Sequence, residues 1–237
     1  LLAVPGADPE AVIYGASVAR GGDVNGDGYL DVLAGAFHYQ GRVDLILGGE
    51  WWKRIVLAGE PELYDLGHVV RLRRDDFPIS RFGEVTSFVG DFNGDGLDDV
   101  AMGLPLGGFD FQGEFQGESF VVFGSDRFGA EPKDVDLGAP RQTPRLQRLG
   151  EYPEDHSGYI RGIGDLNGDG LDDVGIVNIG AATFWARAYV VFGSRTPEDS
   201  LSLGSLGARG FRLLGADDHV FSSGHQGLAT GDLDADG

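Results

Sequence analysis

The segment Asp91-Phe-Asn-Gly-Asp-Gly-Leu-Asp-Asp99 is the main indicator of the fold, because this acidic, glycine-rich loop recurs along the chain. Complete copies also occur at Asp23-Val-Asn-Gly-Asp-Gly-Tyr-Leu-Asp31 and Asp165-Leu-Asn-Gly-Asp-Gly-Leu-Asp-Asp173, and Asp232-Leu-Asp-Ala-Asp-Gly237 begins a fourth. The first aspartates of successive copies lie 68, 74 and 67 residues apart. A period of this length indicates a repeat protein in which each unit is a four-stranded sheet with its loops.

The residue types in the loop match the ligand preference of calcium. Ca²⁺ takes about 6 to 8 oxygen ligands at about 2.3 to 2.6 Å, so a short loop must aim several oxygens at one point. Positions 1, 3, 5 and 9 offer side-chain oxygens and position 7 a backbone carbonyl, while glycine at position 6 permits the positive φ that curls the chain. The expected ligands are Asp23, Asn25, Asp27, Tyr29 and Asp31; Asp91, Asn93, Asp95, Leu97 and Asp99; Asp165, Asn167, Asp169, Leu171 and Asp173; and Asp232, Asp234 and Asp236.

An EF-hand loop opens in the same way, but it needs a glutamate at position 12 and a helix on each side. Position 12 is Ala34, Met102 or Ile176 here, and none of these side chains offers an oxygen. The segments that follow the loops are short, apolar and contain glycine or small residues, which favours buried strands. The EF-hand is therefore excluded, and we expect the position 9 aspartates to close each loop.

An acidic β-turn without an ion is the alternative for any single copy, since Asn-Gly and Asp-Gly are strong hairpin signals. Three copies with the same ligand types in register favour ion binding. The fourth copy differs, because Asp234 replaces asparagine, Ala235 stands at position 4 and no position 9 is present. The sequence thus predicts three calcium ions and leaves the fourth loop open.

The same order of features surrounds every loop. A glycine preceded by an aromatic residue or serine lies upstream, at Tyr14-Gly15, Phe82-Gly83, Ser157-Gly158 and Ser223-Gly224. Strands are expected on both sides of the loop, then a third strand at 41–48, 119–124 and 188–193, and a fourth at 69–73, 145–149 and 211–214. Four short strands per repeat are typical of a β-propeller blade, so the predicted fold class is all-β.

On these residues the chain closely resembles the FG-GAP repeat family, whose repeats build the β-propeller head of integrin α subunits and many bacterial secreted or surface proteins. Phe82-Gly83 is the Phe-Gly of the family name, and Ala34-Gly-Ala36 and Met102-Gly-Leu-Pro105 stand where Gly-Ala-Pro is usual. The resemblance implies that the acidic loop joins the first two strands of a blade and binds calcium. The third unit departs from the pattern, with Ile176-Val-Asn in place of Gly-Ala-Pro.

We expect residues 1–237 to form a single partial propeller with approximate units 1–67, 68–144, 145–210 and an incomplete 211–237. Similar propellers usually have seven blades, and about three and a half units are present here, with residues 1–4 expected as the outer strand of a preceding blade. A repeat needs neighbours to cover its faces and edges. Flanking regions of a longer protein, or pairing of two copies, are therefore expected to complete the ring.

Composition limits the partners and the compartment. The formal net charge is −20, which four Ca²⁺ would reduce to −12, so nucleic acid is excluded as a partner because phosphate contacts need basic patches. The absence of cysteine excludes disulfides and thiol catalysis, which leaves calcium as the stabilising cross-link. No apolar stretch is long enough to span a bilayer and no signal peptide opens the sequence, as expected for a mature or excised fragment.

No catalytic motif is present in the sequence. The five histidines, His38, His68, His156, His219 and His225, lack a metal-binding spacing, and the serines beside His156 and His225 are interpreted as turn residues. The segment 104–118 carries Phe109, Phe111 and Phe115, and this long insertion either binds a ligand or covers a blade edge. Trp51, Trp52 and Trp185 either stack on sugars or fill gaps between blades.

The leading hypothesis is a calcium-stabilised, extracellular β-propeller, secreted or on the cell surface of a bacterium, that acts as an adhesion or protein-binding module. The alternative is a carbohydrate-binding propeller, alone or attached to a polysaccharide-degrading enzyme. A third hypothesis, a calcium-dependent polysaccharide lyase, needs basic and acidic side chains that converge in one cleft. We expect no enzyme activity from this chain itself, and a protein or glycan as its ligand.

Overall fold

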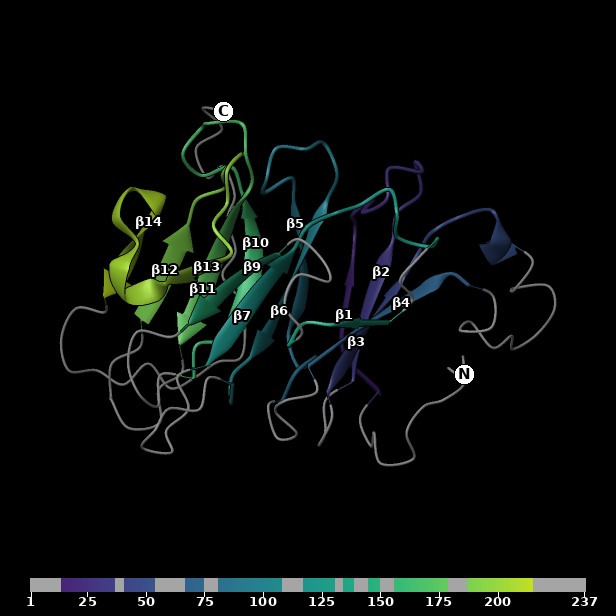
Figure 1. Cartoon of the computed structure of the whole chain (residues 1–237), viewed down its shortest axis with the longest axis horizontal. Coiled ribbons are helices and arrows are strands. Elements are labelled where there is room, and N and C mark those ends of the chain that lie inside the picture. The colour runs from purple at the N-terminus through teal and green to yellow at the C-terminus, as the bar shows by residue number, and fades with distance from the viewer. Residues whose placement is uncertain are drawn as a thin grey trace, which may run out of the picture.

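The computed structural model describes residues 14–36, 41–53, 67–74, 81–107, 117–130, 134–138, 145–149, 156–178 and 187–214. Strands dominate these residues and form three sheets that lie side by side (Figure 1). The strands are β1 (Tyr14–Arg20), β2 (Val32–Ala36), β3 (Arg42–Ile46), β4 (Val69–Arg73), β5 (Thr86–Gly90), β6 (Asp99–Leu104), β7 (Glu118–Val122), β8 (Asp134–Asp136), β9 (Arg145–Leu149), β10 (Tyr159–Gly164), β11 (Asp173–Asn178), β12 (Arg187–Val191), β13 (Ser200–Ser202) and β14 (Gly210–Leu214). The all-β prediction is confirmed.

Each sheet contains four antiparallel strands in the predicted order. These are β1-β2-β3-β4, β5-β6-β7-β9 and β10-β11-β12-β14. The predicted fourth strands 69–73 and 145–149 are confirmed to the residue, and the fourth strand predicted at 211–214 begins one residue earlier, at Gly210. The third strands each end two residues before the predicted end, and their first residues differ from the prediction by one. Two short 3-10 helices, η2 (Leu203–Ser205) and η3 (Gly207–Arg209), precede β14.

Two strands were not predicted. The three-residue strand β8 pairs in parallel with β4 of the first sheet, and β13 pairs in parallel with β9 of the second sheet. Both come from the chain between the third and fourth strands of the following sheet. The second and third sheets therefore each lend a short strand to the edge of the sheet before it, which covers that edge.

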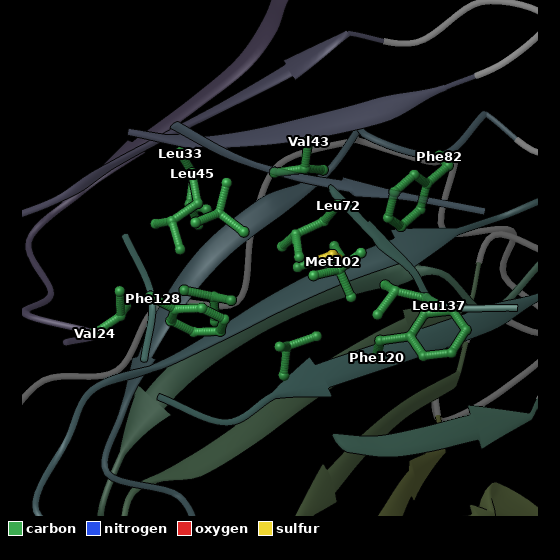
Figure 2. Close-up of a cluster of buried hydrophobic side chains, with 14 of the residues drawn as sticks. Val24, Leu33, Val43, Leu45, Leu72, Phe82, Met102, Phe120, Phe128 and Leu137 are labelled. Atoms are coloured by element: carbon green, nitrogen blue, oxygen red, sulfur yellow. The ribbon is translucent and has the colours of Figure 1, made fainter. Parts of the chain in front are cut away.

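The hydrophobic core lies between the sheets. One cluster joins the first sheet, through Leu33 and Leu45, to the second, through Met102 and Phe120, and Figure 2 shows these side chains pointing toward one another. A second cluster joins the second sheet to the third in the same way, around Tyr189. Each sheet is thus stabilised chiefly by burial of its faces against its neighbours, as expected for stacked repeats.

Glycines allow the sheets to approach very closely. A Cβ atom on Gly35 would lie 1.9 Å from the carbonyl oxygen of Gly83, and one on Gly103 would lie 1.5 Å from that of Gly158. Gly35 and Gly103 hold the same place in β2 and β6, and Gly83 and Gly158 precede the first strand of the next sheet. The Phe82 ring enters the first core cluster beside this contact.

Buried charges also cross between sheets. Arg74, directly after β4, pairs with Glu118 of β7 at 2.7 Å, and both side chains are less than one-tenth exposed. The Arg74 guanidinium also lies over the Phe120 ring, 5.3 Å from its centroid. Because a buried charge is costly without a partner, this pair fixes how the first two sheets meet.

Trp51 and Trp52 pack on the other face of the first sheet. They contact a small buried cluster of Ala34, Ile46 and Val69, and Trp51 stacks on both Trp52 and His68 with ring centroids 4.4 and 4.5 Å apart. Trp51 and Trp52 therefore pack against residues of the first sheet, and these contacts do not reach a second blade. In the described residues no helix is both long and apolar enough to cross a membrane.

Candidate metal centres

The three complete acidic loops join the first and second strands of their sheets, which is the place predicted for them. They link β1 to β2, β5 to β6 and β10 to β11. The glycines at positions 4 and 6 have φ values between 72° and 89° in all three loops, a left-handed region that glycine adopts without strain. The sequence pattern therefore dictates one backbone conformation three times.

The position 1 carboxylate organises each loop. Asp23, Asp91 and Asp165 each accept hydrogen bonds from the backbone N–H groups of positions 4, 5 and 6, at 2.6 to 3.1 Å. These donors favour the charged carboxylate, and in the third loop they lower the pKa of Asp165, with Gly170 N–H contributing most. A negative charge is thus held at the start of the loop.

Positions 3 and 5 form a second repeated contact. The amide Nδ2 of Asn25, Asn93 and Asn167 donates to Oδ2 of the position 5 aspartate at 3.1, 2.8 and 2.9 Å. The same aspartates, Asp27, Asp95 and Asp169, are exposed, and their Oδ1 accepts the backbone N–H of position 7. Two polar side chains therefore point toward the same side of every loop.

The position 9 aspartates lie at the base of the loops and are fully buried. In Asp31, Asp99 and Asp173 one carboxylate oxygen accepts the N–H of position 2, at 2.8 to 3.0 Å. The other accepts the N–H of a glycine two residues beyond the end of the third strand, Gly48, Gly124 or Gly193, at 2.7 to 2.9 Å. The predicted closing residue thus also ties the loop to the third strand.

Burial raises the pKa of these carboxyls against the opposing effect of their backbone donors. The pKa of Asp31 is raised to about 6 and that of Asp99 to about 8, and the pKa of Asp173 is also raised. The desolvation of the carboxylate is the largest cause in each case, and the acidic residues at positions 1 and 5 add to it. A nearby cation would favour the charged form of every one of these groups.

The donor chemistry of the loops fits a hard cation. Each loop offers only oxygen ligands and amide groups, and rotating the asparagine amide by half a turn would put Oδ1 where Nδ2 now faces a carboxylate. In the described part of the chain, no three histidine, aspartate or glutamate side chains already surround a point where a metal could sit. Ion binding therefore requires the side chains to turn from backbone N–H groups toward the ion, and the ligand assignment stays a prediction.

Comparison with known proteins identifies the repeat. The family model described as FG-GAP repeat matches residues 14–46 and 82–122. Over 71% of its length the chain is 30% identical to integrin alpha-PS3 of Drosophila melanogaster. This chain is an FG-GAP repeat protein. The predicted family and its β-propeller architecture are thereby confirmed, and the match to the family model covers strands of the first and second sheets.

The FG-GAP chain matches only part of its relatives. It is 27% identical to integrin alpha-4 of Xenopus laevis over 69% of the chain, and 35% identical to phosphatidylinositol-glycan-specific phospholipase D of Homo sapiens over 64% of it. The aligned region spans 14% of each of these two integrin subunits and 17% of the phospholipase. The similarity therefore concerns the repeats.

Successive loops are held together by the residue at position 8, which the repeat pattern leaves variable. Position 8 is Asp98 in the second loop and Asp172 in the third, and their Oδ2 atoms accept the backbone N–H of Asp23 and Asp91 at 2.7 and 2.8 Å. Backbone bonds between the same residues, Asp98 N–H to the Asp23 carbonyl and Asp172 N–H to the Asp91 carbonyl, lie beside them. The second and third loops thus each bind the first residue of the loop before them.

The first FG-GAP loop lacks this contact. Position 8 is Leu30 there, and its side chain is 61% exposed. The sequence signal was the doubled aspartate, Asp98-Asp99 and Asp172-Asp173, which contrasts with Leu30-Asp31. Only the structure shows that the first aspartate of each pair points to the neighbouring blade.

Several predicted residues lie outside the described part of the chain. They are Asp232, Asp234 and Asp236 of the fourth loop, Phe109, Phe111 and Phe115 of the insertion, Trp185, His38, His219, His225, Ser223-Gly224 and residues 1–4. His156 is described and adopts a φ of 50° at the turn before β10, as its interpretation as a turn residue predicts.

Proposed function

We propose that this chain is a calcium-stabilised β-propeller segment that works outside the cell as an adhesion or ligand-binding module. The observation that carries the proposal is the threefold repetition of one oxygen-rich loop with the same internal hydrogen bonds. Similarity to integrin α subunits supports a role in binding a protein ligand. The proposal concerns this chain's blades, since the relatives it matches are several times longer.

Calcium would have a structural role in these loops. Asp23, Asn25, Asp27, the Tyr29 carbonyl and Asp31 would hold the first ion, and the corresponding residues would hold the second and third. The ion supplies two positive charges, which offset the carboxylates gathered on each loop. The protein's own part is to fix the loop through the position 1 carboxylate and to anchor it to the third strand through position 9.

An extracellular location agrees with this role of calcium. Extracellular calcium modules bind at about 10⁻⁴ to 10⁻³ M, a concentration range that the cell interior does not supply. A chain without cysteine has no disulfide to stabilise it there, so three ions would replace that cross-link. We propose no catalytic role for the chain, although one relative has phospholipase D in its name.

Calcium titration of loop variants tests the ion assignment. Isothermal titration of the full chain with CaCl₂ should show at least three ions, and Asp27→Ala, Asp95→Ala and Asp169→Ala should each remove one. These position 5 side chains are exposed, so their loss leaves the core intact. An unchanged stoichiometry in all three variants would contradict the assignment.

Capture experiments test the binding function. Beads that carry the full chain would be offered purified extracellular proteins and a glycan panel, in calcium and in chelator, beside beads with the triple variant Asp27→Ala/Asp95→Ala/Asp169→Ala. The proposal predicts that a protein is retained only by the calcium-loaded wild-type chain. Retention of glycans alone would instead support the carbohydrate-binding alternative.

A further inference from the structure

The start of the first loop and that of the second are each held by the following repeat. The N–H of Asp23 donates to Oδ2 of Asp98 at 2.7 Å, and the carbonyl of Asp23 accepts the N–H of Asp98 at 3.2 Å. Asp172 binds both backbone groups of Asp91 in the same way, at 2.8 and 3.1 Å. One residue of the later loop therefore holds both backbone polar groups of position 1 in the loop before it.

A further contact from the following repeat fixes position 2. The Val24 carbonyl accepts the N–H of Ser125, and the Phe92 carbonyl accepts the N–H of Ser194, both at 2.8 Å. The side chains of Val24 and Phe92 are fully buried. The first two positions of these loops are thus bound to the next repeat, whereas the N–H groups of positions 4 to 6 bind within the loop.

Glycines leave the space that the aspartate contacts need. The residue before position 1 is Gly22 in the first loop and Gly90 in the second. A Cβ atom on Gly22 would lie 3.0 Å from Cβ of Asp98, and one on Gly90 would lie 2.1 Å from Oδ2 of Asp172. A side chain at either place would therefore displace the aspartate of the following repeat.

The third loop shows the same sequence without this cover. Asp165 at position 1 and Leu166 at position 2 are exposed, whereas Asp23 and Asp91 are half-buried. In the part of the chain that the structure describes, a Cβ atom on Gly164, before this loop, would meet no atom within 4 Å. The loop's own residues therefore set its hydrogen bonds, and the following repeat adds the contacts at positions 1 and 2.

Position 1 supplies the first ligand of each proposed calcium site. Its carboxylate must turn from the N–H groups of positions 4 to 6 toward the ion, so its direction depends on the backbone of its own residue. A segment that is already fixed in its bound conformation loses less conformational freedom on binding, which raises the affinity. Asp23 and Asp91 are fixed in this way through both backbone groups.

We propose that Asp98 and Asp172 are positioning residues for calcium binding in the loop before their own. Asp98 positions Asp23 at the first site, and Asp172 positions Asp91 at the second. The inference rests on the proposed calcium sites and deepens that function, because it makes each of these two sites depend on the following repeat.

Isothermal titration with CaCl₂ of chains that keep a single site tests the proposal. Asp95→Ala/Asp169→Ala keeps the first site and Asp27→Ala/Asp169→Ala keeps the second, while Asp27→Ala/Asp95→Ala/Asp169→Ala gives the background from any further site. Asp98→Ala and Asp98→Asn are added to the first chain, and Asp172→Ala and Asp172→Asn to the second. Thermal unfolding in chelator verifies that each chain folds.

Two control substitutions separate positioning from general effects. Asp126→Ala removes one exposed carboxylate from the second repeat. Val135→Ala removes methyl groups from the core between the first two sheets, which lowers stability without removing a hydrogen bond of a loop. Neither control should change the calcium affinity of either single-site chain.

We expect Asp98→Ala to weaken calcium binding at the first site by about fivefold, and Asp172→Ala to do the same at the second, because the N–H of position 1 loses its acceptor. The asparagine variants should stay within about twofold of their parent chains, since the amide oxygen can still accept this N–H.

Unchanged affinity in both folded alanine variants would overturn the positioning role and leave the calcium assignment standing. Equal losses in the alanine and asparagine variants would also overturn it, because the lost charge would then be the cause. A loss of the same size in Val135→Ala or Asp126→Ala would overturn it as well, since general stability or charge would explain the result. Absence of calcium binding in both single-site chains would overturn the calcium assignment, and the positioning role with it.

Discussion

At the scale of single residues, Asp98 and Asp172 show how one side chain can join two repeats. Position 8 varies among the loops, but in the second and third loops its carboxylate accepts the backbone N–H of the first residue of the preceding loop. Gly90 makes room for this contact, since a Cβ atom there would lie 2.1 Å from Asp172 Oδ2. The contact couples the order of one loop to that of the next.

Replacing Asp172 with alanine should therefore destabilise the chain. The Asp91 N–H would lose a charged acceptor, for which we expect a loss of about 1 to 2 kcal/mol in the free energy of unfolding. Urea unfolding in chelator measures this, with Asp126→Ala as the control because Asp126 is exposed and removes the same charge. Equal effects of the two substitutions would mean that the contact contributes nothing.

The ligand residues were easier to predict than their partners. Regular spacing marked Asp31, Asp99 and Asp173, because the repeat places them in register. Their second hydrogen-bond donors, Gly48, Gly124 and Gly193, lie 17, 25 and 20 residues further along the chain. This distance varies with the length of the connection between the second and third strands, so no fixed spacing reveals the pair.

At the scale of elements, the four antiparallel strands of each blade followed from apolar runs between turns, whereas β8 and β13 did not. A strand of three residues has too little periodicity to recognise. Its parallel partner also belongs to another repeat, so the pairing depends on how the blades stack. Val135 of β8 is nevertheless fully buried in the core between the first two blades.

The short strand β8 should contribute measurably to stability. Val135→Ala removes two buried methyl groups, and we expect a loss of about 2 kcal/mol in the free energy of unfolding. Asp134→Ala in the same strand should cost less than about 1 kcal/mol, because its pair with Arg73 is exposed. Chemical denaturation measures the free energy of unfolding of both variants. A larger loss in Asp134→Ala than in Val135→Ala would contradict the packing described for β8.

The Arg74–Glu118 pair offers a second test at this scale. Glu118→Leu leaves a buried guanidinium without its carboxylate, so we expect a loss of about 3 to 5 kcal/mol. Adding Arg74→Met to the same chain should restore at least about 2 kcal/mol, because the remaining buried charge is removed. If Arg74→Met/Glu118→Leu were less stable than Glu118→Leu, the unpaired charge of Arg74 would not be the cause of the loss, and the packing of the two side chains would be.

At the scale of the whole molecule, the sequence predicted blades but not how they meet. The Phe-Gly and Gly-Ala signatures were recognised as marks of the repeat, and the structure explains them as a close contact in which Gly35 and Gly103 touch the backbone of the following blade. The bonds from Asp98 and Asp172 to the preceding loop were not predicted, because the two partners of each bond belong to different repeats. Contacts within a repeat were therefore predictable, and contacts between repeats were not.

The measurement that most directly tests the account is thermal unfolding of the full chain in chelator, in Mg²⁺ and in millimolar Ca²⁺. Three ions that bind only the folded chain should raise the melting temperature by at least about 10 °C, since each ion at 100 times its dissociation constant contributes about 2.7 kcal/mol. Mg²⁺ should have a much smaller effect, because it keeps its water and demands a rigid octahedral site. The same melting temperature in chelator and in Ca²⁺ would mean that the loops are ion-free acidic turns, and the calcium-stabilised propeller would have to be abandoned.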